Sequence, residues 1–147
     1  MRQVRNKIFE TNSSSVHSLQ VDGSGLEPSK LKIDKDGYIN VEFGSFGKEY
    51  RIYSSQYEKL QYLITCLYYL HNSVEEIYDS YEFERICNAV CAYTGALGIK
   101  IVDDESRAYI DHQSIPYESI EIINTYDYDE IKNFIFNKYI SLKTDCD

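Results

Sequence analysis

The stretch SSQYEKLQYLITCLYYLH, residues 54–71, carries the clearest structural pattern in this chain of 147 residues. Its apolar residues recur every three or four positions, which places them on one face of an α-helix. They are Leu60, Leu63, Ile64, Leu67 and Leu70. The hydroxyl of Ser54 or Ser55 can accept a hydrogen bond from the first turn. The pattern therefore predicts a helix that begins at one of these serines and ends at about His71.

Two further helical regions follow this stretch. Ser73 and Glu76 fit the S-x-x-E capping box, and apolar residues continue at helical spacing over residues 74–93. The acidic centre of this region can break it into two pieces, and Gly95 is a typical helix end. A last helix is predicted from Asp127 or Asp129 through Leu142.

The first half of the chain is predicted to form strands, because short apolar stretches alternate there with turn residues. The predicted strands cover residues 4–9, 16–21, 31–33, 38–43 and 49–53. Asp34-Lys35-Asp36-Gly37 separates the third strand from the fourth and is typical of a hairpin turn. Two later strands, 98–102 and 108–112, predict a second hairpin.

These elements predict an α+β protein, in which an N-terminal antiparallel sheet packs against about three helices. A further short hairpin is expected near residues 98–112. The length suits a single domain spanning residues 1–147, with a core that buries roughly two-thirds of the unfolded surface.

The densest polar chemistry lies between the first two predicted strands, in ETNSSSVHS, residues 10–18. A turn that needed only polarity would more often use Gly or Pro with a single Asn or Asp. The segment contains these chemically distinctive residues: Glu10, Asn12, Ser13, Ser14, Ser15, His17 and Ser18. The alternative is a hydroxyl-rich loop that bonds its own backbone.

A second polar segment, residues 111–114, follows the predicted strand 108–112 and begins with Asp111 and His112. A histidine beside carboxylates and hydroxyls suits general acid–base chemistry, although a structural Asp–His turn is equally consistent. We expect the two segments to be neighbours, with His17 and His112 within about 12 Å.

The candidate residues divide into two groups. The catalytic candidates are His17, His112, Asp111 and Glu10. The candidates for holding an anion or cofactor are Asn12, Ser13, Ser14, Ser15, Ser18 and Arg5. If the segments meet, the catalytic group could also form a metal cluster, but no metal is predicted. The chain contains no GxGxxG, Walker A, HExxH or nucleophile-elbow motif, so the sequence names no cofactor and leaves catalysis undecided.

The charge balance points to a protein partner. The net charge is −9, from 24 acidic and 15 basic residues, and the acids are concentrated after residue 74. This argues against affinity based on neutralising a nucleic-acid backbone, whereas it suits a partner protein with a basic surface. The fifteen tyrosines are compatible with a binding surface or with core edges. The alternative for the acidic residues is a solvated surface that binds no partner. No apolar run in the sequence is long enough for a membrane span.

The four cysteines are predicted to be free thiols. Cys87 and Cys91 lie four positions apart on a predicted helix, where adjacent turns do not provide disulfide geometry. The chain has no CxxC pair and only three histidines, which argues against a zinc site.

The opening VRNKIFETNSSSVHS, residues 4–18, resembles the opening of small proteins of phages and prophages of low-GC Gram-positive bacteria. Residues 110–114, IDHQS, and residues 134–137, FIFN, are similar to later segments of the same group. The resemblance implies no activity. It implies accessory phage or mobile-element biology, in which small acidic proteins often block host machinery such as CRISPR effectors. Separately, residues 1–5 lack the apolar core of a secretory signal, so we expect a protein of the host-cell cytoplasm.

Two hypotheses follow. The first is a phage-type accessory protein that binds and modulates or inhibits a host or phage protein through an acidic, tyrosine-rich surface. The second is a small enzyme or a nucleotide- or phosphate-binding protein with its site at residues 10–18 and 111–114. The charge and the missing catalytic motifs favour the first.

Overall fold

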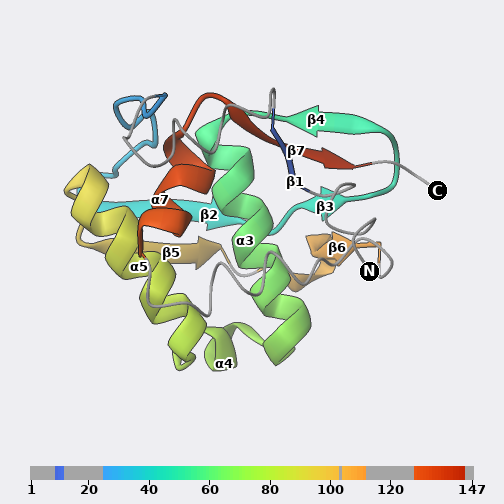
Figure 1. Cartoon of the computed structure of the whole chain (residues 1–147). Helices are drawn as coiled ribbons and strands as arrows, with labels where there is room; N and C mark the ends of the chain where they lie inside the picture. Colours follow the sequence, from blue (N-terminus) through green and yellow to red (C-terminus); the bar gives the residue numbers. More distant parts are fainter. Residues whose placement is uncertain (1–8, 12–24, 103, 112–127, 145–147) are drawn as a thin grey trace.

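The computed structural model describes residues 9–11, 25–102, 104–111 and 128–144 (Figure 1). It confirms the α+β class. The strands are β1 (Phe9–Thr11), β2 (Tyr38–Glu42), β3 (Ser45–Phe46), β4 (Arg51–Tyr53), β5 (Gly98–Val102), β6 (Tyr109–Ile110) and β7 (Ile140–Thr144). The helices are α3 (Gln56–His71), α4 (Val74–Tyr78), α5 (Tyr81–Thr94) and α7 (Tyr128–Phe136), with a short 3-10 turn at Glu105–Arg107.

Helix α3 is the central element, since it contacts α4, α5, α7, β2 and β6. It begins as predicted, with the Ser55 hydroxyl accepting from the backbone N–H of Glu58 at 3.1 Å. It ends at Asn72, whose φ of 71° breaks the helix. Four of the five residues of the predicted apolar stripe are fully buried, whereas Leu70 is 38% exposed.

The predicted break in the second helical region is confirmed. The Ser73 hydroxyl caps α4 by accepting from the backbone N–H of Glu76 at 3.1 Å. The Ser80 hydroxyl then caps α5 by accepting from the backbone N–H of Phe83, also at 3.1 Å. Gly95, with a φ of 85°, ends α5. Serine caps therefore set the start of each of these helices.

The hairpin predicted between residues 31–33 and 38–43 is wrong, because residues 31–33 form no strand. The turn itself forms. The Asp34 carboxylate accepts from the backbone N–H groups of Asp36 and Tyr38, each at 2.9 Å. These bonds close a local turn without a ladder, and β2 pairs in parallel with β5 instead.

The hairpin predicted near residues 98–112 also needs correction. Both strands form, as β5 and β6, but they do not pair with each other. β5 pairs with β2, and β6 pairs with β3, each in parallel. The 3-10 turn at Glu105–Arg107 lies between β5 and β6 in the chain. After this turn the chain forms β6 alongside β3 and not alongside β5.

The C-terminal helix is shorter than predicted. It ends at Phe136, and Leu142 lies in strand β7 rather than in the helix. The Asn137 side chain accepts from the backbone N–H of Tyr139 at 2.9 Å, and this local bond competes with continuation of the helix. β7 lies between β1 and β4 in an antiparallel sheet. The expected antiparallel sheet therefore contains strands from both ends of the chain.

A buried lysine holds this C-terminal connection in place. Lys59 of α3 is only 1% exposed. Its Nζ donates to the backbone carbonyls of Asn137 at 3.1 Å and Ile140 at 2.7 Å. Burial lowers the pKa of Lys59 to about 8.

The first prediction concerns the stability contributed by Lys59 as pH rises. The folded protein releases the Lys59 proton from about pH 8, whereas the unfolded chain holds it to about pH 10.5. The unfolded state therefore binds more protons in this window, so the contribution of Lys59 to the free energy of unfolding increases with pH. The variant Lys59→Met lacks this increase. At neutral pH it is less stable by about 1–3 kcal/mol, because carbonyl groups lose their donor.

Urea denaturation of both proteins across the alkaline range measures the effect. The raised pKa of Cys87 acts in both proteins and cancels in the difference between them. If the difference in the free energy of unfolding between the two proteins stays the same at every pH, the role given to Lys59 is contradicted.

Candidate functional site

Two of the residues proposed from the sequence lie in the described part of the chain, and they belong to different sheets. Glu10 lies in β1, opposite Ser141 of β7. Asp111 directly follows β6, and its backbone N–H donates to the carbonyl of Phe46 in β3 at 3.1 Å. The other candidates lie outside the described residues: Arg5, Asn12, Ser13, Ser14, Ser15, His17, Ser18 and His112. The expected proximity of His17 and His112 stays a prediction.

The described residues show neither a metal-binding group of side chains nor a membrane-spanning helix. They contain no group of three or more His, Cys, Asp or Glu residues placed to hold a metal ion. Across the same ranges, none of the helices has the length and apolar character to span a membrane.

The cysteines of the described ranges are thiols that form no disulfide, as predicted: Cys66, Cys87 and Cys91. Burial raises the pKa of the Cys87 thiol to about 12 and also raises the pKa of Cys91. Both thiols are therefore protonated at neutral pH. Since the thiolate is the nucleophile and the metal ligand, these two residues suit packing better than catalysis.

Helices α4 and α5 carry an acidic face made of Glu75, Glu76, Asp79 and Glu84. All four side chains are exposed, and residues 74–84 contain no Lys or Arg. None of the four carboxylates forms an ion pair with another described residue. Figure 1 shows α4 at the end of the molecule opposite to β4 and β7. The acidic face therefore lies at one end of the described structure.

The neighbouring acid Glu82 differs from this group. Its carboxylate lies 2.9 Å from the Nε2 atom of His71 and links the end of α3 to the start of α5. This contact has a structural role, so Glu82 is not counted in the acidic face.

Several tyrosines hold the fold through their hydroxyl groups. The phenol oxygens of Tyr57, Tyr69 and Tyr78 accept from strand backbone N–H groups at 3.0, 3.1 and 2.8 Å. These donors belong to β2, β6 and β5, each of which pairs with a single strand among the described residues. The helices thus satisfy strand N–H groups that the ladders leave unpaired. Composition alone does not reveal this use of tyrosine.

Tyrosine rings nevertheless reach the surface beside the acidic face. Tyr78 is 43% exposed and Tyr81 is 51% exposed. The Tyr78 hydroxyl is already bonded to the backbone of Ile101, so the position of its ring is set by the fold.

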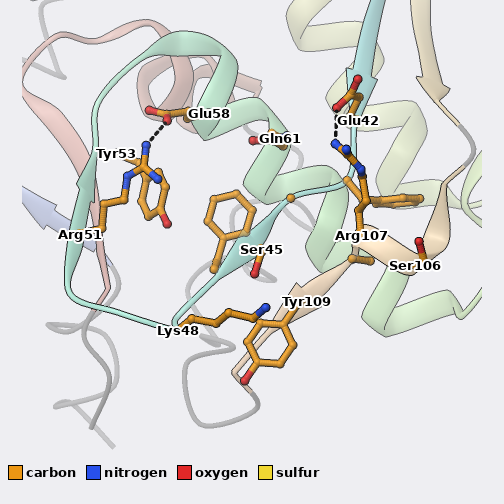
Figure 2. A pocket seen from close by; sticks show the side chains of 14 residues that line it. Glu42, Ser45, Lys48, Arg51, Tyr53, Glu58, Gln61, Ser106, Arg107 and Tyr109 are labelled. Atoms are coloured by element: carbon orange, nitrogen blue, oxygen red, sulfur yellow. Dashed lines mark hydrogen bonds and ion pairs between the residues drawn. The ribbon is translucent and has the colours of Figure 1, made fainter.

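A pocket of about 550 Å³ lies among β3, β4, β6 and the first half of α3 (Figure 2). Its labelled lining side chains are Glu42, Ser45, Lys48, Arg51, Tyr53, Glu58, Gln61, Ser106, Arg107 and Tyr109. The sequence patterns do not predict this pocket. The one available signal was the pair of glycines that brackets β3.

The second of these glycines, Gly47, shapes the edge of the pocket. Its φ is +97°, and a Cβ added there would approach the Cβ of Asp111 within 2.7 Å. A side chain at this position would be strained and would also displace Asp111. Gly47 therefore permits the close approach of β3 to the end of β6.

Ion pairs flank the pocket on opposite sides (Figure 2). Arg51 lies 3.2 Å from Glu58, and Arg107 lies 3.1 Å from Glu42. Between them, the ammonium group of Lys48 lies 5.0 Å from the centre of the Tyr109 ring.

Comparison with known protein families, curated proteins and solved structures finds no match to this chain. Its function therefore has to be inferred from its own residues.

The second prediction separates structural tyrosines from surface tyrosines. Tyr78→Phe leaves the backbone N–H of Ile101 without its acceptor and lowers the free energy of unfolding by about 1–3 kcal/mol. Tyr50→Phe is the matched control, since Tyr50 is 58% exposed and its hydroxyl bonds no other described residue. Urea denaturation of the two variants measures the difference. Equal losses would show that the Tyr78 hydroxyl has no special structural role.

Proposed function

We propose that this protein binds a partner protein through the acidic face of α4 and α5, and that binding modulates or inhibits the partner. The observation that carries the proposal is the group of exposed carboxylates of Glu75, Glu76, Asp79 and Glu84, which have no ion-pair partner among the described residues. A basic surface on a partner would neutralise them and would be steered toward them before contact.

The exposed rings of Tyr78 and Tyr81 support a protein partner. Tyrosine contributes a large, partly apolar contact area and is enriched among residues that dominate binding energy. Because the Tyr78 hydroxyl is held by the fold, little conformational freedom of its ring is lost on binding. The face therefore combines charge for steering with aromatic area for affinity.

The partner is expected to be a host or phage protein with a basic surface, including one that normally holds nucleic acid. The resemblance of residues 4–18 to phage and prophage proteins supports this setting. An accessory protein of this kind would act in the host cytoplasm, for example on a defence effector such as CRISPR machinery. Neither nucleic-acid backbone binding nor membrane binding is part of the proposal.

A second candidate is a small enzyme or phosphate-binding protein that uses residues 10–18 and 111–114. One observation favours it. Tyr109 of β6 lines the pocket, and the chain passes from β6 directly into Asp111, the first residue of the second polar segment.

The third prediction tests the acidic face by charge reversal. Glu75→Lys/Glu76→Lys reverses two acids on the face. Asp36→Lys/Glu49→Lys reverses two exposed acids elsewhere and produces the same change in net charge. Proteins that the wild type retains from an infected host lysate should be lost with the first variant and kept with the second. For a retained partner, the association rate of the first variant should fall roughly tenfold or more at low salt, and less as salt rises.

A third variant, His17→Ala/His112→Ala, distinguishes the two candidate functions. If it abolishes retention while the Glu75→Lys/Glu76→Lys variant keeps it, the chemical-site hypothesis replaces the binding proposal. If the two charge-reversal variants retain the same proteins from the lysate, the role proposed for the acidic face is also overturned.

A further inference from the structure

Cations meet at the pocket although the chain is strongly acidic. Lys48, Arg51 and Arg107 line the pocket in a protein of net charge −9. Lys48 follows β3, Arg51 begins β4, and Arg107 ends the 3-10 turn before β6. The lining also contains Glu42 and Glu58, which pair with the two arginines. The fold therefore brings three cations and two carboxylates to the pocket from separate segments, and Lys48 supplies the excess positive charge.

The arginines are held in place by carboxylates. Glu58 contacts Arg51, whose guanidinium also lies 4.7 Å from the centre of the Tyr53 ring. Glu42 and Asp104 contact Arg107 at 3.1 and 3.4 Å. A guanidinium has five N–H donors, so these contacts leave donors on each arginine for a ligand. The ion pairs thus orient the arginines without occupying all of their donors.

Lys48 has a different environment. Its ammonium group lies over the ring of Tyr109, and no carboxylate of the described residues is within ion-pair distance. Figure 2 shows Lys48 and Tyr109 between the two flanking ion pairs, with Ser45 nearby. The hydroxyl of Ser45 adds a neutral donor to the same lining, whereas the hydroxyl of Ser106 already donates to the Asp104 carboxylate.

The donors and the volume together indicate a class of ligand. We infer that the pocket binds a small organic phosphate, with Lys48 as its principal charge partner. A phosphate monoester offers three acceptor oxygens and nearly two negative charges, so it can contact several donors at once, whereas a carboxylate offers two oxygens and one charge. The volume of about 550 Å³ falls within the roughly 300–1,000 Å³ of small-molecule sites and leaves room for an organic group. The ring of Tyr109, 38% exposed, offers apolar surface to that group.

This site is independent of the proposed acidic face, which lies on α4 and α5 and contributes no residue to the pocket. A partner-binding function can therefore fail while the pocket binds its ligand, and the reverse also holds.

The fourth prediction tests the pocket with named probes: adenosine monophosphate, ribose phosphate, inorganic phosphate and adenosine. Calorimetric titration of the full chain should detect saturable binding of at least one of the two esters, weaker binding of inorganic phosphate and no binding of adenosine. Lys48→Gln should weaken ester binding by about tenfold or more, since a hydrogen bond to a charged group is lost.

Lys100→Gln is the matched control. Lys100 is an exposed lysine 4.7 Å from the centre of the Tyr38 ring, but it does not line the pocket. Amide NMR spectra check that both variants keep the fold. The proposal is overturned if neither ester binds, if both lysine variants weaken binding equally, or if adenosine binds as tightly as its phosphate. If inorganic phosphate binds as tightly as the esters, the inference that the ligand carries an organic group is overturned.

Discussion

The buried ammonium group of Lys59 is the constraint on which the arrangement of the two chain ends depends. Removing a charge from water costs several kcal/mol unless polar partners replace the lost hydration. The carbonyls of Asn137 and Ile140, where α7 gives way to β7, provide those partners. Their position relative to α3 fixes where β7 begins. Because β7 pairs with both β1 and β4, the same contact helps to locate the whole antiparallel sheet.

The second constraint is the satisfaction of strand edges. Within the described ranges, two of the three sheets have only two strands, so each of these strands leaves one side of its backbone without a ladder partner from the described residues. Tyrosine hydroxyls from α3 and α4 accept three of these N–H groups. Much of the tyrosine content therefore serves the fold. The proposed binding surface uses the exposed rings of Tyr78 and Tyr81.

Net charge and local charge lead to different expectations for function. The value of −9 describes the whole surface and supports a basic protein partner. It does not describe the pocket, where Lys48 has no acidic partner among the described residues. The chemistry of residues 10–18 and 111–114 was visible in the sequence because those residues are contiguous. The pocket was not, because Arg107 lies more than fifty positions from Lys48 and Arg51 and joins them only through the pairing of β3 with β6.

The sequence by itself determined helix α3, the helical region that contains α4 and α5, and the serine caps that start α3 and α4, because these features depend on neighbours within one or two turns. The cap at Ser80, where that region divides, was found only in the structure. Only the tertiary structure decided which strands pair. Residues 31–33 have strand-like composition but form no strand, and β5 and β6 find partners far away in sequence. The same holds for Leu142, which the sequence pattern placed at the end of the last helix but which is buried in β7. Strand pairing depends on contacts between distant segments, and local periodicity does not identify which strands become partners.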